Sequence, residues 1–556
     1  SAVHVGRCVP IYRKLGQFQT KKLREITYSL LEHVEKGSFV DIIPEEIISR
    51  RSLCRYFEAL RQMHFPSESS NMNLYEVFRS PAQMRLIYEE FFWMALLYGF
   101  KKSERNREEK LVKIEISNQT LARVKKVLPF TLTGAQRSVF KQISADMRSD
   151  IPMNRLVQGD VGSGKTIIAF LAMYLAIENG YQAALMAPTE ILAEQHFANA
   201  KEFFGKLNLE TDILTGSLRV GEKRKVKARI ASGASNAIIG THALIQDDVN
   251  FCALGLAVID EQHRFGVLQR AQLRESGLNP EVIVMTATPI PRSLAISVYG
   301  DLDYSVIDEL PPGRTPVKTV VVGEDKRTGV YKGISREVAT GRQVYIVYPL
   351  IKESEKMDLK AATEMYDDLR TQIFPELRIA LLHGKLKAEE KEDIMRRFTR
   401  GEVDILVSTT VIEVGVDVPN ATLMVIEHAE RFGLSQLHQL RGRVGRGSEE
   451  SFCVLLTADK KSETARQRLG IMEKTSNGFE VAEKDLEIRG QGELLGTRQS
   501  GKRAFKLANI VRDKQILEEV QEDVTNMFKE SGKSEEVEQL LRIVECDPRM
   551  NFLDFA

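Results

Sequence analysis

Apolar residues recur at helical spacing through the first part of the chain. The pattern is clearest over Leu23–Val34 and Met84–Leu97, and it predicts two helices there. Between them, Pro66–Asn73 (PSESSNMN) has the composition of a loop. The charged run Lys101–Lys110 is typical of a solvated helix face. We therefore expect residues 1–125 to form a mainly helical N-terminal region.

From residue 126 the pattern changes to short apolar runs separated by helical stretches, which is typical of buried parallel strands. In residues 126–313 the runs are Arg155–Gln158, Ala183–Ala187, Ala237–Gly240, Leu256–Ile259 and Val282–Met285. In residues 314–460 the runs are Val344–Val347, Ile379–Leu382, Ile405–Ser408, Leu423–Ile426 and Cys453–Leu456. Leu310–Pro316 (LPPGRTP) has the composition of a linker between the two blocks. The alternation predicts an α/β fold with two doubly wound parallel sheets in tandem, followed by a helical, charged region over 461–556.

Composition limits the classes of protein to consider. With 556 residues the chain is long enough for three or four domains of about 150 residues each. No apolar run approaches the ~20 residues needed to cross a bilayer, so we expect no membrane contact. The formal net charge is only +1, so any nucleic-acid contact must come from local clusters of Lys and Arg.

The five cysteines are scattered, and none forms a C-x-x-C pair. This argues against a disulfide framework and a structural zinc site, and favours a reducing, cytoplasmic compartment. The segment Ser1–Arg7 has neither an initiator Met nor the apolar stretch of a signal peptide, which indicates a fragment or a processed chain.

A phosphate-binding loop is predicted at Gly159–Thr166 (GDVGSGKT), which matches G-x-x-x-x-G-K-[ST]. The motif follows a predicted strand and opens an apolar helix, as this chemistry requires. Glycines let backbone N–H groups approach phosphates, and the helix N-terminus adds positive potential. Lys165 is expected to reach the β- and γ-phosphates, and the Thr166 hydroxyl to bind Mg²⁺. The glycines expected around the phosphates are Gly159, Gly162 and Gly164.

An acidic pair, Asp260–Glu261, ends the predicted strand Leu256–Ile259. Placed on the same sheet as the phosphate loop, these carboxylates would lie beside the bound phosphates. Asp260 is expected to hold Mg²⁺, directly or through water. Glu261 is expected to orient or deprotonate the attacking water.

A third element, Gln439–Arg446 (QLRGRVGR), lies in the second α/β block. We expect Arg443 and Arg446, three positions apart, to project from one helical face. Such charges stabilise phosphoryl transfer when they act from across a cleft. If they come from another domain, nucleotide binding would clamp the two domains together and hydrolysis would release them.

The motifs GDVGSGKT, APTEILAEQH, GTHAL, DEQH, TATPIPR, LLHGKL, STTVIEVGVDVPNA and QLRGRVGR occur in the order that resembles the superfamily 2 helicases, over residues from about 130 to 456. The resemblance implies two RecA-like domains. It also implies that Gln136 reads the adenine, with Phe130 packing nearby, that Asp417 approaches the ribose, and that Gln439 belongs to the catalytic set. Residues implied to contact DNA or couple hydrolysis to motion are Pro188, Thr189, Thr241, His263, Thr286, Ala287, Thr288, Lys385, Ser408 and Thr409.

The segment 478–501 (GFEVAEKDLEIRGQGELLGTRQSG) resembles the translocation motif shared by the RecG family of branch-migrating helicases and the transcription-repair coupling factors. The coupling residues that this implies are Arg489, Gln491, Gly492 and Gln499. The N-terminal stretches GQFQTKKLREI, IIPEEII and LRQMHFP look like the RecG-family region between the wedge and the motor. Two features depart from that family: no OB-type wedge precedes this region, and Gln491 stands where Pro is expected.

The resemblance implies an ATP- and Mg²⁺-dependent translocase on double-stranded DNA that remodels branched DNA by fork reversal and branch migration in recombination and repair. The expected partners are branched or forked duplex DNA and a single-stranded DNA-binding protein. We expect a monomer in the bacterial cytoplasm, at the nucleoid.

Two alternatives stay open. One is the motor of a transcription-repair coupling factor, although the partner-binding domains of such a factor are not seen. The other is a nucleotide-gated DNA-binding module that does not hydrolyse ATP, against which Lys165, Glu261, Arg443 and Arg446 all argue. A primosome helicase should carry a zinc-binding Cys cluster, and this sequence has none.

Overall fold

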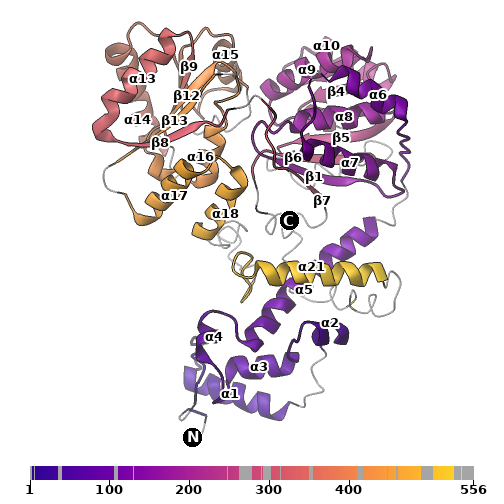
Figure 1. Cartoon of the computed structure of the whole chain (residues 1–556), viewed down its shortest axis with the longest axis vertical. Coiled ribbons are helices and arrows are strands. Elements are labelled where there is room, and N and C mark those ends of the chain that lie inside the picture. Colours follow the sequence, from indigo (N-terminus) through magenta and orange to yellow (C-terminus); the bar gives the residue numbers. More distant parts are fainter. Residues whose placement is uncertain are drawn as a thin grey trace. The chain divides into compact units, whose positions relative to one another are not determined.

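The structure is a computed structural model of the whole chain (Figure 1). The structure describes residues 3–4, 7–34, 41–105, 110–128, 130–246, 248–261, 279–289, 291, 302–312, 315–349, 355–409, 417–447, 449–458, 461–489, 505–530, 540 and 542. The chain divides into two compact units. Unit 1 comprises Ser1–Glu104, Arg292–Asp301 and Arg489–Ala556, and unit 2 comprises Arg105–Pro291 and Leu302–Ile488.

Unit 2 contains two parallel sheets. The first has seven strands in the order β3-β4-β2-β5-β6-β1-β7, and every pairing in it is parallel. The strands are β1 Asn154–Gly159, β2 Gln182–Met186, β3 Thr211–Leu214, β4 Ala237–Gly240, β5 Leu254–Asp260, β6 Glu281–Thr286 and β7 Asp303–Ile307. The helices and the 3-10 turn that accompany this sheet are α6 Asn118–Val127, α7 Gly134–Arg148, α8 Lys165–Glu178, α9 Glu190–Gly205, α10 Val220–Ala231 and η2 His242–Ile245.

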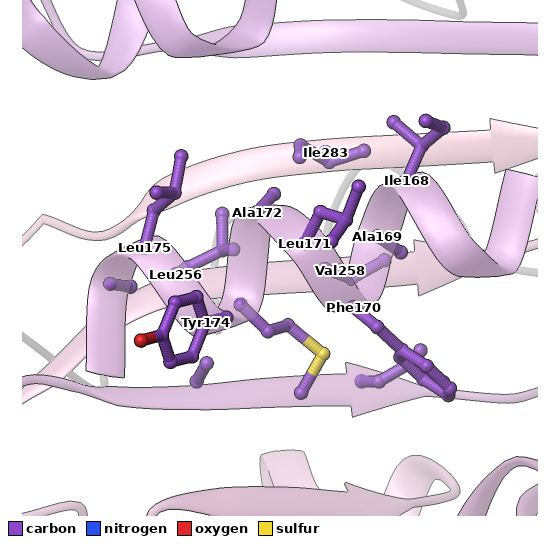
Figure 2. Packing of buried hydrophobic residues seen from close by; sticks show 14 of the residues in the cluster. Ile168, Ala169, Phe170, Leu171, Ala172, Tyr174, Leu175, Leu256, Val258 and Ile283 are labelled. Atoms are coloured by element: carbon purple, nitrogen blue, oxygen red, sulfur yellow. The ribbon is translucent and has the colours of Figure 1, made fainter. Parts of the chain in front are cut away.

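Helix α8 lies at the centre of the first core (Figure 2). Its sequence KTIIAFLAMYLAIE is apolar on all sides, which is the pattern of a helix buried in a larger core. Leu171 and Leu175 are fully buried, and they belong to the same cluster as Leu256, Val258 and Ile283 of the sheet. The helix that follows the phosphate loop is therefore held rigidly against the strands.

The second sheet has six parallel strands in the order β10-β11-β9-β12-β13-β8. Its strands are β8 Lys318–Gly323, β9 Gln343–Val347, β10 Ile379–Leu382, β11 Ile405–Ser408, β12 Ala421–Ile426 and β13 Phe452–Thr457. Alternate residues of β9 enter two separate clusters: Val344 and Ile346 lie in one, Tyr345 and Val347 in the other. Both faces of the sheet are thus buried, as expected for a doubly wound fold.

The remaining elements of unit 2 complete this second domain. They are η4 Glu324–Lys326, α13 Arg327–Ala339, α14 Glu355–Asp368, the π-helical turn η5 Leu369–Ile373, α15 Ala388–Thr399, η7 Ala429–Arg431, α16 Leu434–Arg441, α17 Glu463–Lys474 and α18 Gly478–Arg489. Leu469, Met472 and Val481 join the core on one face of the second sheet. The packing of this domain therefore continues past residue 460, where the sequence analysis places a boundary; the four-region division stays a prediction.

The fold class expected from the sequence is confirmed, and every strand predicted from an apolar run is present to within a few residues. No apolar run in the sequence predicts β3, β7 and β8. These three strands lie at sheet edges, where one side lacks a neighbour and polar residues replace part of the apolar run.

The described secondary structure of unit 1 is mainly helical. Its helices are α1 Thr20–His33, α2 Glu45–Arg50, α3 Tyr56–His64, α4 Met72–Glu76, α5 Pro81–Arg105 and α21 Lys514–Glu530. The predicted loop Pro66–Asn73 is shorter than expected, because α4 begins at Met72 with an Asn71 side-chain cap. Asp523 of α21 accepts hydrogen bonds from Arg51 (2.8 Å) and from the Tyr88 hydroxyl of α5 (2.6 Å), which ties the C-terminal helix to the N-terminal ones.

Two further observations concern the described residues. Among the residues that the structure describes, no helix is long and apolar enough to cross a membrane. The described cysteines Cys8, Cys54, Cys252 and Cys453 are free.

Candidate nucleotide site

The register of the first sheet brings three predicted motifs together at the carboxyl ends of its strands. In the sheet β6 lies between β5 and β1, and Gln158 of β1 is level with Thr286 of β6. Asp260 of β5 is level with Met285 of β6. The carboxyl ends of these strands carry the phosphate loop, the Thr286–Thr288 segment and the acidic pair. Ligands of open parallel sheets bind at this kind of edge.

The phosphate loop has the backbone that its glycines predict. Gly162 and Gly164 adopt φ values of 76° and 84°, in the left-handed region that L side chains avoid. Gly159 has an ordinary φ, but a Cβ there would collide with Ser163 and would lie 3.1 Å from Ile307. Helix α8 begins at Lys165 without a side-chain cap, so its N-terminal N–H groups face the loop.

Lys165 is held in the loop by backbone carbonyls. Its Nζ donates to the oxygen of Gly159 at 2.7 Å and to that of Asp160 at 2.9 Å. Burial lowers the pKa of Lys165, and the nearby Glu261 and Asp260 carboxylates oppose that shift. A desolvated ammonium group at the N-terminus of a helix is well placed to bind an anionic ligand.

Gln136 is positioned by the start of α7. Thr133 and Gln136 form a capping box, in which the Gln136 Oε1 accepts from the Thr133 N–H at 2.9 Å. The Gln136 Nε2 donates to the Ser163 carbonyl at 2.9 Å, and the side chain is buried. Both ends of this amide are therefore used within the protein, against the phosphate loop. Its contact with adenine stays a prediction, as does that of Phe130, which is half exposed.

The acidic pair has two different environments. A hydrogen bond of 2.8 Å joins the Asp260 carboxylate to the His196 Nε2 from α9. Glu261 has a φ of 56°, unusual for a residue with a Cβ, and its N–H donates to the Met285 carbonyl at 3.0 Å. Left-handed non-glycine residues are concentrated at functional sites.

The arginines of the second domain lie beyond a helix, which corrects the expectation that they share a helical face. Helix α16 ends at Arg441, and Gly445 adopts a φ of 74°, so the chain turns between Arg443 and Arg446. Burial lowers the pKa of Arg443 to about 10, with the charge of Arg446 adding to the shift. Arg446 forms an ion pair with Asp417 at 2.8 Å.

Within unit 2, the segment Gln439–Arg446 packs against the first α/β domain. A Cβ at Gly442 would lie 2.9 Å from Val161 of the phosphate loop. Gln439 Nε2 donates to the Thr288 hydroxyl at 2.8 Å, and Gln158 donates to the Thr288 carbonyl at 3.2 Å. The Thr286–Thr288 segment therefore touches both the phosphate-loop strand and the second domain, which suits its predicted coupling role.

Three residues of this junction are missing from the sequence-based set. The Asp160 carboxylate takes part in hydrogen bonds with His438 Nε2 (2.6 Å) and with the Gly478 N–H (3.1 Å). Asp160 occupies a variable position of the phosphate-loop motif, and His438 lies just before the arginine motif. The only signal in the sequence is that Asp160 lies inside the phosphate-loop motif and His438 directly before the arginine motif.

The residues predicted to contact DNA differ in exposure. Pro188 and Thr189 are partly exposed, Thr189 caps α9, and Lys385 is exposed. Thr241, Ser408 and Thr409 are buried, with 2%, 0% and 0% exposure. These three hydroxyls are thus not exposed in this structure, and their contact with DNA stays a prediction. His263, Gln491, Gly492, Gln499 and the side chain of Arg489 lie outside the described residues.

The described residues fit a nucleoside triphosphate with Mg²⁺. The Ser163 hydroxyl is buried without a hydrogen-bond partner in the described part of the chain. The glycines leave a cradle that a Cβ would fill, and Lys165 supplies a desolvated cation. The partly exposed Thr166 hydroxyl and the Asp260 carboxylate are oxygen ligands of the kind that Mg²⁺ prefers.

Two tandem parallel-sheet domains, with a phosphate loop in one and the arginine-bearing segment of the other against it, define a fold of the two-domain helicase class. Family models agree with this definition. They match residues 133–296 as a DEAD/DEAH box helicase, 326–448 as a helicase conserved C-terminal domain, and 475–545 as ATP-dependent DNA helicase RecG, domain 3, C-terminal.

Curated relatives identify the family. An ATP-dependent DNA helicase RecG of Synechocystis sp. is 48% identical over 531 residues, which cover 96% of this chain and 63% of that protein. The ATP-dependent DNA helicase RecG of Bacillus subtilis is 46% identical over 520 residues, covering 93% and 75%. The chain therefore belongs to the RecG family of ATP-dependent DNA helicases.

A solved structure agrees over most of the chain. The structure of RecG bound to a three-way DNA junction matches with a TM-score of 0.71 and 43% sequence identity. The match covers 92% of this chain and 66% of that one. The chain thus spans about two thirds of the length of these relatives.

Proposed function

We propose that this chain is the ATP-driven motor of a RecG-type helicase, which pulls duplex DNA and so remodels branched DNA in recombination and repair. One observation carries the proposal: the arginine segment of the second domain lies against the phosphate loop of the first. Gly442 packs on Val161, and Gln439 bonds Thr288. A nucleotide at this junction would be sensed by both domains, which is the requirement for converting hydrolysis into movement.

The proposed roles follow from these positions. Lys165 binds the phosphates, and Thr166 and Asp260 hold Mg²⁺, which supplies charge neutralisation during phosphoryl transfer. Glu261 orients or deprotonates the attacking water. Arg443 and Arg446 stabilise negative charge that develops on the phosphates. Burial of Arg443 strengthens its electrostatic interactions, because water screens them less.

The proposed substrate is branched duplex DNA, and its support is the similarity to RecG bound to a three-way junction. Binding of a single-stranded DNA-binding protein, a monomeric state and a place at the bacterial nucleoid rest on the family resemblance alone. The transcription-repair reading is disfavoured by the match of residues 475–545 to the RecG domain 3 model.

The test measures ATP hydrolysis with and without a three-way junction assembled from oligonucleotides, at fixed salt because phosphate contacts are salt-dependent. Junction-stimulated turnover and regression of the junction are expected. Lys165→Ala should reduce both by at least about a hundredfold, because the phosphates lose their buried cation.

Lys141→Ala is the matched control, since Lys141 is exposed on α7 and should leave turnover within about twofold. A folded protein without DNA-stimulated turnover would contradict the proposal. Displacement of a stalled RNA polymerase with no action on junctions would favour the transcription-repair alternative.

A further inference from the structure

The carboxylate of Asp160 joins three segments that are far apart in sequence. Its Oδ1 accepts from the Val161 N–H at 2.6 Å within the phosphate loop, and also bonds His438 Nε2 of α16 at 2.6 Å. Its Oδ2 accepts from the N–H of Gly478, the first residue of α18, at 3.1 Å. Burial opposes ionisation of Asp160, but the bonds from His438, Val161 and Gly478 hold its pKa below the usual range. Asp160 is thus an anion shared by both α/β domains.

The direction of the His438 bond follows from the other ring nitrogen. Nδ1 of His438 lies 2.9 Å from an Arg441 guanidinium nitrogen, which can only donate. Nδ1 must therefore accept, and the proton of the neutral ring lies on Nε2. His438 donates this proton to Asp160. Both His438 and Arg441 are buried, with 4% and 3% exposure.

Arg441 links α16 to the turn between α17 and α18. Its guanidinium donates to the carbonyls of Met472 (3.0 Å) and Thr475 (2.8 Å), at the end of α17, and to that of Ser476 (3.2 Å). Two residues later the chain reaches Gly478, whose N–H returns to Asp160. The turn between α17 and α18 is thereby fixed from both sides.

The space around residue 478 leaves no room for a side chain, so glycine is required there. A Cβ at this position would lie 2.5 Å from His438 Nε2, 2.6 Å from Pro289 and 2.9 Å from the Asp160 carboxylate. Pro289 follows the Thr286–Thr288 segment. The start of α18 therefore fits against the phosphate loop, against the segment after β6 and against α16 at the same time.

We propose that Asp160, His438 and Gly478 form a latch that positions the start of α18 according to the state of the phosphate loop. The proposal rests on the proposed function and adds positioning residues to it. Movement of the phosphate loop, or separation of the two α/β domains, removes the partner of the Gly478 N–H and frees the α17–α18 turn. Helix α18 opens the segment 478–501, so the latch connects the nucleotide directly to the predicted translocation segment.

His438 variants test the latch through a coupling ratio, the amount of junction regressed per ATP hydrolysed. His438→Phe keeps a ring of similar size but removes the donor to Asp160. We expect it to lower the ratio at least tenfold, with a KM for ATP within about threefold of the unaltered chain. His438→Gln provides an amide N–H that can reach Asp160, and we expect it to restore the ratio to within about threefold.

Gly478→Ala attacks the same latch from the other helix and should lower the ratio similarly. Ser435→Ala is the matched control: Ser435 lies on α16 and donates to Asp485 of α18 at 2.6 Å, without touching Asp160. It should leave the ratio within about twofold. Thermal unfolding establishes that each variant is folded; if His438→Phe is not, Gly478→Ala carries the test.

The outcomes separate the two proposals. If the unaltered chain lacks junction-stimulated hydrolysis, the proposed function fails. If the unaltered chain regresses junctions and both His438→Phe and Gly478→Ala keep its coupling ratio, only the latch fails. If Ser435→Ala lowers the ratio as much as His438→Phe, general packing of α16 on α18 matters and the latch is overturned.

Discussion

Individual residues of the first domain are held in states that the unfolded chain would not favour. Glu261 accepts a left-handed backbone, and Lys165 loses its water shell to two carbonyls. Glu281, at the start of β6, is buried with 1% exposure and lies 2.5 Å from Lys110, which is also buried. Burial raises the pKa of Glu281 to about 7, although Lys110 opposes the shift. Buried ion pairs of this kind are weak contributors to stability, because desolvation offsets the attraction.

Glu281 gives a pH-dependent prediction. Its folded-state pKa lies above the unfolded value of about 4.3, so protonation favours the folded state. Its contribution to the free energy of unfolding is present at low pH and is lost as pH rises to about 7. Denaturant unfolding, followed by circular dichroism from pH 5 to 8, should show the unaltered chain losing stability relative to Glu281→Gln. Parallel pH curves for the two proteins would contradict this.

At the scale of elements, α7 is the support of the phosphate loop. Its capping box fixes Gln136, and Gln136 in turn donates to the Ser163 carbonyl in the loop. The helix end and the loop are therefore one hydrogen-bonded structure. This explains why Gln136 lies in the site even though both ends of its amide form hydrogen bonds inside the protein.

Removal of the cap gives the element-scale prediction. Thr133→Ala should lower the free energy of unfolding by about 1 kcal/mol, the usual cost of a lost N-cap. It should also weaken ATP binding, because Gln136 loses its fixed position. Thr133→Ser, which keeps the hydroxyl, is the control. ATP titration and denaturant unfolding measure the two effects, and an unchanged affinity in Thr133→Ala would separate the cap from the site.

At the scale of the whole molecule, both units have buried apolar residues, but unit 1 also uses charged groups to join distant parts of the chain. Buried Phe91 and Phe92 of α5 and buried Leu517 and Val520 of α21 belong to unit 1, and charged side chains link the first hundred residues to α21. Asp523 is the centre of that connection. Burial would raise its pKa, but bonds from Arg51 and Tyr88 lower it, and Arg50 adds a further contact at 2.9 Å.

Asp523 provides the whole-molecule prediction. Asp523→Ala should destabilise unit 1 by about 2–3 kcal/mol, less than the ~3–5 kcal/mol of a fully buried pair, because Arg50 and Arg51 remain partly exposed. Trp93, the single tryptophan, belongs to α5, so its fluorescence reports unfolding of unit 1. Glu522→Ala removes an exposed partner of Arg51 and should cost less than about 1 kcal/mol. Equal effects of the two substitutions would contradict the role of Asp523.

The sequence by itself determined the tandem α/β fold and the position of the phosphate loop, because buried parallel strands are continuous apolar runs and phosphate chemistry needs glycines at fixed spacing. The edge strands β3, β7 and β8 were not predicted, because half-solvated strands lack such a continuous apolar run. The backbone path through Arg443 and Arg446 was predicted wrongly as helical. Helix α16 ends at Arg441, where Gly442 packs tightly against Val161. Only the tertiary structure showed that Asp160, His438 and Gly478 meet, because hydrogen bonds between residues 278 and 318 positions apart leave no periodic trace in a sequence.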